Sequence, residues 1–227
     1  SLVNEGVAAL LNRVPQGSAK QIPVVVYNQS SWNRSGFVTC KISYPASWKG
    51  HELKDAAGNK VTCELISQSP GQHELELGLM ATDIPSIGYK TYYACEAKSF
   101  PLGYTELKNE NLENEKISVK FGTGGISSFY DKVRKQEVLK TDKFFGAEVI
   151  QMGAPTVAWE NQEPATMDDF DKTSMHEFKT IRAVESPLRY IVEKEAKMNY
   201  FTLRERFIIT KETGELTIEA DVLNWTG

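Results

Sequence analysis

An acidic segment at residues 167–172 carries the clearest candidates for chemistry. Asp168 and Asp171 lie in it, and His176 follows shortly after. Closely spaced carboxylates can bind Ca²⁺ or act as acid and base, and His176 could join Asp168 or Asp171 as a metal ligand. The segment lacks the Asp-x-Asp-x-Asp-Gly order of a calcium loop. A solvated loop is therefore the favoured interpretation, with His176 as a half-exposed cross-strand partner in the strand-like segment that follows.

Aromatic residues offer a second kind of site. Trp159 begins the polar run Trp-Glu-Asn-Gln-Glu, inside a stretch at 153–173 where no strand pattern is visible. An exposed tryptophan can stack on a sugar ring, and loops of this length are usually functional or mobile. The alternative is that the tryptophans, Trp159 included, pack in the core of a β-sandwich, where aromatic residues are common.

The sequence contains no motif for a complete catalytic centre. His51 and His73 have no nucleophile motif beside them, and no zinc-protease, phosphate-loop or dinucleotide motif occurs. The glycines of residues 121–125 lie between two expected strands, which favours a hairpin over an anion site. The three cysteines form no Cys-x-x-Cys pair and are interpreted as small buried hydrophobic residues. We therefore assign no catalytic residue and no metal ligand.

The composition is that of a folded protein without the charge of a nucleic-acid binder. The 227 residues are 41% hydrophobic and 25% charged, and 26 Lys and Arg against 30 Asp and Glu give a net charge of -4. No basic run is present, so nucleic acid is not an expected partner. No apolar stretch reaches the roughly 18 residues of a membrane span. We expect a soluble protein, and the start, without an initiator Met or a basic leader, indicates an excised piece that lacks its signal region.

The elements that must position these residues are almost all strands. An apolar stripe at helical spacing over residues 3–14, followed by Pro15 and Gly17, predicts one short N-terminal helix. Beyond it the period changes to two, which is typical of β-strands. We predict an all-β protein with antiparallel strands at 22–27, 36–44, 60–68, 73–80, 89–98, 116–121, 125–132, 144–152, 174–185, 188–198, 200–210 and 214–223.

A polar stretch rich in Asn and Glu divides these strands into two groups. Residues 1–18 are expected to be the C-terminal helix of an upstream helical domain. Residues 19–100 are expected to form a small β-sandwich, and 101–113 a connector. Residues 114–227 then form the first part of a larger antiparallel β-sandwich.

Several segments, taken in their order along the chain, carry a family resemblance. They are Val24 to Asn28 with Ser31 to Gly36, Asp55 to Val61, Ile84 to Tyr93, Leu112 to Lys132, Glu185 to Arg189, and Asp221 to Trp225. Their order resembles that of the β domains in family 38 glycoside hydrolases, the retaining α-mannosidases. The family usually has Asn-Pro where this chain has Asn28-Gln29, a difference confined to one turn.

The resemblance covers residues 22–225 and has definite implications. The second sandwich would be the galactose-mutarotase-like C-terminal sandwich of the family, and the first helix the end of its three-helix middle domain. The parent would be a zinc-dependent enzyme whose Asp nucleophile and most zinc ligands lie in an N-terminal α/β barrel, outside this sequence. No catalytic residue and no cofactor transfers to this chain. The implied partners are the barrel, the middle domain and a mannose-containing oligosaccharide, which Trp159 and Asp168 would contact.

The function implied is that of a non-catalytic scaffold in a glycosidase that hydrolyses terminal α-mannosyl residues. By itself the chain would be inactive, because it offers no pair of carboxyl groups placed about 5 Å apart across a glycosidic bond. An autonomous carbohydrate-binding sandwich with its own aromatic platform is the alternative. A structural or adhesion protein has only the fold class in its favour.

Overall fold

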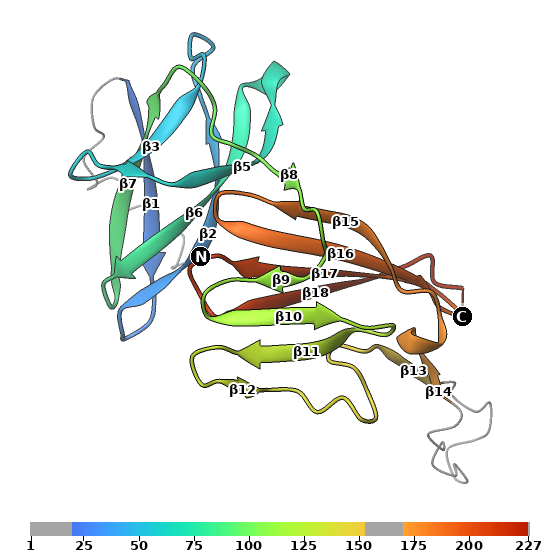
Figure 1. The fold of residues 1–227 in the computed structure, drawn as a ribbon. Coiled ribbons are helices and arrows are strands. Elements are labelled where there is room, and N and C mark those ends of the chain that lie inside the picture. Colours follow the sequence, from blue (N-terminus) through green and yellow to red (C-terminus); the bar gives the residue numbers. More distant parts are fainter. Residues whose placement is uncertain (1–19, 153–169, 227) are drawn as a thin grey trace, which may run out of the picture. The chain divides into compact units, whose positions relative to one another are not determined.

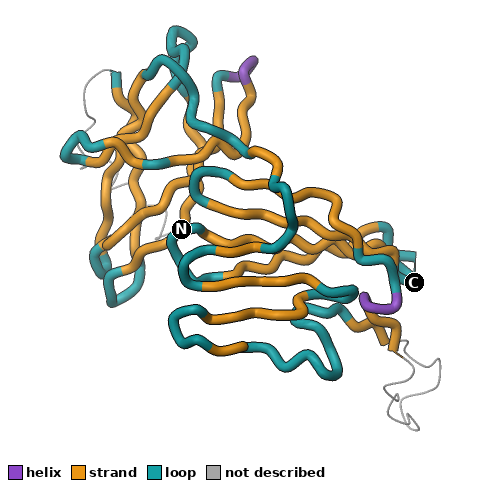
Figure 2. The backbone as a smooth tube through the Cα atoms, in the orientation of Figure 1, coloured by secondary structure: helices purple, strands orange, loops and turns teal. Residues whose placement is uncertain are grey.

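The computed structural model describes residues 20–152 and 170–226, and these form an all-β chain (Figures 1 and 2). Their only helical elements are two single 3₁₀ turns, η1 (Pro70–Gln72) and η3 (Thr173–Met175). The expected helix at residues 1–18 lies outside the described residues. The all-β prediction is confirmed for the part of the chain that can be compared.

The chain divides into two compact units. Unit 1 holds the residues up to Thr105 together with Ser186–Leu188, and unit 2 holds Glu106–Glu185 and Arg189–Gly227. Each unit has a hydrophobic core of its own. Two cores are expected when two groups of strands are separated along the chain, because each group must bury its own apolar faces.

Unit 1 is built from two antiparallel sheets that pack around one core. The sheets have the orders β1-β7-β3-β4 and β2-β6-β5. Alternate residues of each strand face inward, so that Leu53, Leu77 and Leu79 have no exposed surface. The strands are β1 (Gln21–Asn28), β2 (Arg34–Ser43), β3 (His51–Asp55), β4 (Lys60–Val61), β5 (Cys63–Ser69), β6 (Glu74–Ile84) and β7 (Gly88–Glu96).

Asn28 closes the end of β1 in unit 1. Its side chain is almost completely buried, and its Nδ2 donates to the carbonyl oxygens of Trp32 at 2.7 Å, Ile84 at 3.2 Å and Pro85 at 3.0 Å. Its Oδ1 accepts from the Ser30 amide at 3.0 Å. One side chain thus satisfies backbone groups from two loops, which fixes the turn that the sequence marks as different from the family pattern.

Replacing Asn28 with Ala is therefore expected to destabilise unit 1 by about 2 kcal/mol, because buried carbonyl groups lose their donor. Asn33→Ala is the matched control: Asn33 lies on the same loop but accepts only one exposed bond, from the Ser86 amide at 3.1 Å. It should cost less than about 1 kcal/mol. Urea unfolding of both variants measures the difference, and equal losses would contradict the role given to Asn28.

Unit 2 contains two larger antiparallel sheets and a short ribbon. The larger sheets have the orders β12-β11-β10-β9 and β18-β17-β16-β15-β8, and the ribbon pairs β13 with β14. Long hairpins dominate it (Figure 2). Its strands are β8 (Thr105–Glu106), β9 (Leu112–Glu113), β10 (Ile117–Phe121), β11 (Ile126–Asp131), β12 (Gln136–Glu137), β13 (Ile150–Met152), β14 (Phe170–Lys172), β15 (Lys179–Glu185), β16 (Arg189–Lys197), β17 (Thr202–Thr210) and β18 (Leu216–Leu223).

The two faces of the five-stranded sheet differ in chemistry. On one face Leu203, Phe207 and Ile209 of β17 are buried in the core. The other face carries a ladder of ion pairs, in which Glu193 binds Arg182 at 2.9 Å and Arg206 at 3.1 Å. Apolar and charged side chains thus alternate along β17, as expected when the two faces of a sheet lie in different surroundings.

Two expected strands of unit 2 are shorter than the sequence pattern predicts. The pattern at 144–152 yields a strand only at Ile150–Met152, and the pattern at 174–185 only from Lys179. The physical reason is Thr173, which is fully buried. Its hydroxyl exchanges hydrogen bonds with the backbone of Val149, and its amide donates to the Val149 carbonyl at 3.1 Å. These bonds join Val149 to Thr173 next to Ile150 and Lys172, where the pairing of β13 with β14 ends.

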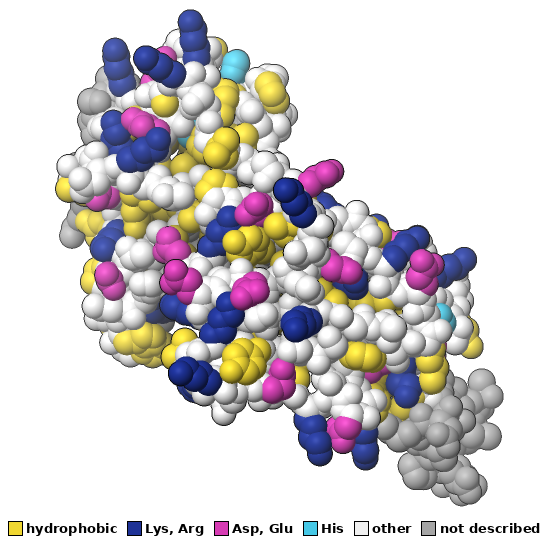
Figure 3. Space-filling view, viewed as in Figure 1, with side chains coloured by type: hydrophobic (Ala, Val, Ile, Leu, Met, Phe, Trp, Pro, Cys, Tyr) yellow, Lys and Arg dark blue, Asp and Glu magenta, His cyan; other side chains and the backbone are white. Residues whose placement is uncertain are grey.

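Positive and negative side chains are interspersed on the face of the molecule drawn in Figure 3. This mixture agrees with the small net charge of -4. On that face there is no broad patch of one sign among the described residues, as a phosphate-binding surface would require.

Candidate functional site

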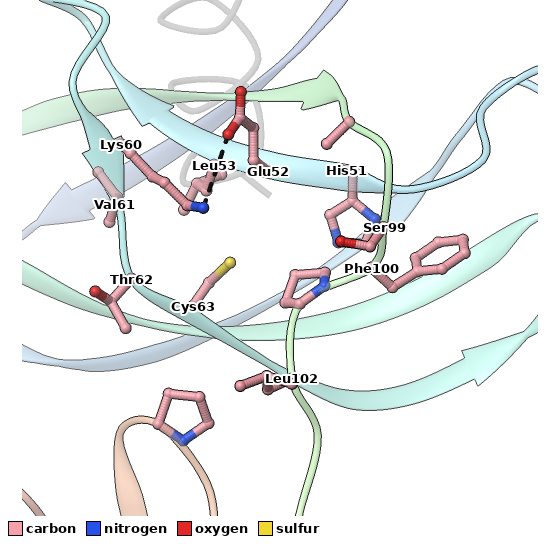
Figure 4. Close-up of a pocket in the computed structure, with 13 residues that line it drawn as sticks. His51, Glu52, Leu53, Lys60, Val61, Thr62, Cys63, Ser99, Phe100 and Leu102 are labelled. Atoms are coloured by element: carbon pink, nitrogen blue, oxygen red, sulfur yellow. Dashed lines mark ion pairs between the residues drawn. The ribbon is translucent and has the colours of Figure 1, made fainter.

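A pocket of unit 1 lies between strand β3, the β4–β5 segment and residues 97–102 (Figure 4). It has a volume of about 370 Å³. Leu53 and Cys63 form part of its buried lining, and Glu52 and Lys60 are its charged side chains. The sequence pattern does not indicate this pocket, because it does not predict β3.

Gly50 allows the wall of this pocket to close. A Cβ atom at Gly50 would lie 2.2 Å from the carbonyl carbon of Ser99, far inside contact distance. Because Gly50 has no side chain, its carbonyl oxygen can accept a hydrogen bond from the Ala97 amide at 3.0 Å. This close approach brings the chain after β7 against the start of β3, where His51 follows.

His51 is the most unusual group in the pocket. Its side chain is 2% exposed, and neither ring nitrogen has a hydrogen-bond partner. The ring reaches toward the segment of Ser99 and Phe100, and its centroid lies 5.2 Å from that of Phe100 in an edge arrangement (Figure 4). Burial lowers the pKa of His51 from 6.5 to about 4, so the imidazole is neutral at physiological pH.

The other reactive groups of the pocket are also held in unreactive states. Burial raises the pKa of the Cys63 thiol from 9.0 to about 11, so Cys63 stays protonated and is a poor nucleophile. Glu52 pairs with Lys54 at 2.9 Å and with Lys60 at 4.0 Å. The nitrogens of His51 are covered and cannot reach a solute in the pocket. The pocket thus has no activated nucleophile with a base beside it.

His176 in unit 2 is placed differently from its predicted position. It follows η3 instead of lying within a strand, and its Nε2 is 2.5 Å from the Oδ1 of Asp171 on β14. The other oxygen of Asp171 accepts from the Asn199 amide at 3.2 Å. Of the two carboxylates that the sequence offered as partners, Asp171 therefore forms the contact. Asp168 lies outside the described residues, as does Trp159.

The core of unit 2 holds a buried cation. Lys194 is 4% exposed, and its ammonium lies 5.3 Å from the ring centroids of both Phe121 and Phe178. It donates to Glu110 at 2.7 Å and to Thr180 at 2.8 Å. Burial acts to raise the pKa of Glu110, but the hydrogen bonds from Lys194 and Thr180 outweigh it and lower that pKa. Lys194 is thus a paired structural charge.

Glu205 on β17 is the direct cross-strand partner of Lys194 on β16. It is 1% exposed, its Oε2 has no hydrogen-bond partner, and burial raises its pKa from 4.5 to about 7. A carboxyl group with such a pKa suits a general acid. A substrate cannot reach one that is so deeply covered, however, so the geometry assigns Glu205 to the core and not to a reaction.

A metal site is equally unsupported by the described side chains. No three or more His, Cys, Asp or Glu residues among them gather closely enough to hold an ion. The zinc chemistry that the family resemblance implies does not fit these residues.

Comparisons with solved structures identify the fold. An α-mannosidase from Enterococcus faecalis V583 superimposes with a TM-score of 0.72 and 14% identity over 97% of this chain. A glycosyl hydrolase family 38 protein from Enterococcus faecalis gives 0.71 and 13% over 96%. This chain has the fold of one part of a family 38 glycosidase. It spans about a third of each of those chains, 32% and 33%.

This likeness agrees with the resemblance noted in the sequence, and its support comes from the structures. No protein-family model and no curated protein matches the sequence. Both family 38 structures match nearly all of this chain, so the match includes both β units. Within the described residues, no helix is both long and apolar enough to cross a bilayer.

Proposed function

We propose that this chain is the non-catalytic β-sandwich portion of a retaining α-mannosidase that removes terminal α-mannosyl residues. The observation that carries the proposal is the superposition of 97% of the chain on about a third of an α-mannosidase. The zinc ion and the nucleophile belong to a catalytic barrel outside this sequence. The chain packs against that barrel and a helical domain, and serves as their scaffold.

The geometry of the described residues supports a scaffold over an independent enzyme. The pocket of unit 1 has a covered imidazole and a protonated thiol, and the carboxyl group of unit 2 whose pKa is raised is buried in a core. The unpaired atoms of the imidazole and of the carboxyl group are covered by packing, and the thiol is held in its protonated, unreactive form. Trp159 and Asp168 remain the proposed contacts to the sugar.

The test is an assay of the purified chain with an aryl α-mannoside and added Zn²⁺. We expect no turnover above the blank, whereas a longer natural chain that includes these residues should hydrolyse the substrate in the same buffer. Turnover by the 227-residue chain alone would overturn the proposal. Circular dichroism of the same sample confirms that the inactive chain is folded.

An independent carbohydrate-binding module is the second candidate, and one observation favours it. Trp32 is 64% exposed at a loop of unit 1, which is how a sugar-stacking residue is presented. Titration of the chain with a mannose oligosaccharide separates the two functions. Binding in the micromolar to millimolar range that Trp32→Ala abolishes would establish the module, and absence of binding is expected for the scaffold.

A further inference from the structure

The buried face of the five-stranded sheet ends abruptly at its edge strand. Directly opposite residues of β17 and β18 lie on the same face of the sheet. Leu203 and Phe207 of β17 are at most 1% exposed, but their partners Val222 and Ile218 are 56% and 42% exposed. The core thus covers β17 and leaves its neighbour open. We call Ile218, Ala220 and Val222 the β18 face.

The outer edge of β18 is also open. Within residues 20–152 and 170–226, β18 pairs only with β17 and is the last strand of its sheet. It is eight residues long. A long edge strand with an apolar face exposes both unpaired backbone groups and hydrophobic surface, and proteins usually cover such an edge.

The charges of β18 select what can cover it. The face opposite to the β18 face carries Glu219 and Asp221. Glu219 binds Arg206 at 2.7 Å, and Asp221 lies opposite Arg204, which is engaged with Glu195 at 2.9 Å. A strand added to the free edge would place its own side chains beside these carboxylates. Basic residues there would be favoured and acidic ones repelled.

A second copy of this chain does not meet that requirement. If two β18 strands paired antiparallel about Ala220, Ile218 would meet Val222 of the other copy, which is favourable. The same register places Glu219 opposite Asp221 twice, and like charges directly opposite each other destabilise a pair. In this register a second copy is therefore a poorer occupant than a strand that carries basic residues.

We propose that an extended strand of alternating apolar and basic residues, supplied by the rest of the larger glycosidase, pairs with the edge of β18 and covers the β18 face. The inference rests on the proposed function, which provides the additional polypeptide: the family 38 chains extend well beyond the third that matches here. The apolar residues of that strand would pack on Ile218 and Val222, and its basic residues would neutralise Asp221.

The test joins a peptide of alternating Lys and Val, as long as β18, to the C-terminus through a short Gly-Ser linker. Such a linker gives a local concentration in the millimolar range, so even weak pairing is visible. A second fusion carries alternating Glu and Val. We expect amide hydrogen exchange in β18 to slow by about tenfold in the Lys-Val fusion relative to the Glu-Val fusion.

Substitutions separate specific pairing from general adhesion. Val222→Lys should speed amide exchange in β18 of the Lys-Val fusion by about tenfold, back to the rate of the chain alone, because it removes an apolar contact. Val138→Lys, at an exposed valine just after β12, is the matched control and should change nothing. Asp221→Lys should shift the preference to the Glu-Val fusion.

Equal protection by both peptides, protection by neither, or protection that Val222→Lys leaves intact would overturn the inference. So would a dimer of the chain without a peptide in which β18 is already protected, since a second copy would then be the occupant. None of these results depends on mannoside hydrolysis. Failure here is therefore distinct from failure of the proposed function, which the activity assay reports.

Discussion

Phe207→Ala is expected to lower the free energy of unfolding of unit 2 by about 3 to 5 kcal/mol. Phe207 has no exposed surface. Its ring lies 4.8 Å from that of Phe121 and 6.5 Å from that of Phe178, both in edge arrangements. Because Phe121 belongs to the β10 sheet and Phe207 to the five-stranded sheet, truncation opens a cavity between two layers that hold each other in place.

The matched control for this prediction is Ile218→Ala, at the position directly opposite Phe207 on β18. Ile218 is 42% exposed, so its truncation should cost less than about 1 kcal/mol. Hydrogen exchange resolves the two units, and the slowest amides of unit 1 should be unchanged in both variants. A cost for Ile218→Ala comparable to that of Phe207→Ala would mean that the β18 face is buried in the chain by itself.

The strands that the sequence predicts best are those whose alternation is regular and whose turns are short. The segment expected at 214–223 is observed at Leu216–Leu223, and that at 116–121 at Ile117–Phe121. The glycine-rich residues between β10 and β11 form the expected hairpin, since the two strands pair antiparallel. In these places local pattern and tertiary pairing require the same structure.

Strand β3 shows why other elements were missed. Its sequence, His-Glu-Leu-Lys-Asp, has one strongly apolar residue and gives almost no period-two signal. It becomes a strand because it pairs with β7 on one side and β4 on the other. Such pairing is decided by the rest of the unit and cannot be read from five residues alone. The pocket lined by His51 was missed with it.

Glu205 is a case in which a signal was present. Four buried residues alternate along β17, and they are Leu203, Glu205, Phe207 and Ile209. Three of them are apolar, and Glu205 is the exception. A charged residue in phase with a core face predicts either a misplaced strand or a carboxyl group with a perturbed pKa. The structure supports the second interpretation, since burial raises the pKa of Glu205.

Unit 1 is expected to lose stability as the pH falls, and unit 2 as the pH rises. His51 in unit 1 has a pKa of about 4 in the folded chain against 6.5 when unperturbed, because its burial disfavours the charged form. Unit 1 is therefore at full stability above about pH 6.5 and loses it as the pH falls toward 4, since only the unfolded chain is protonated in that window. The loss approaches about 3 kcal/mol, because one pKa unit corresponds to about 1.36 kcal/mol.

Glu205 makes the stability of unit 2 depend on pH in the reverse sense. Burial raises its pKa from 4.5 to about 7, so the folded unit holds a proton that the unfolded chain has released between these values. The contribution of Glu205 to the stability of unit 2 is complete below about pH 4.5, and about 3 kcal/mol of it is lost as the pH rises through 7. Lys194, which faces Glu205 across the pair, is already engaged with Glu110 and Thr180.

Hydrogen exchange of the slowest amides in each unit, followed from about pH 4 to pH 8 after correction for intrinsic rates, measures both slopes. Glu205→Gln should remove the alkaline loss of unit 2, stabilising it by about 3 kcal/mol at pH 8 and hardly at all at pH 4. His51→Phe should remove the acid loss of unit 1, whereas His73→Asn, at an exposed histidine of the same unit, should leave that loss in place. Parallel pH profiles for the two units would show that these buried groups do not control their stability, and that the pocket of unit 1 opens enough to hydrate His51.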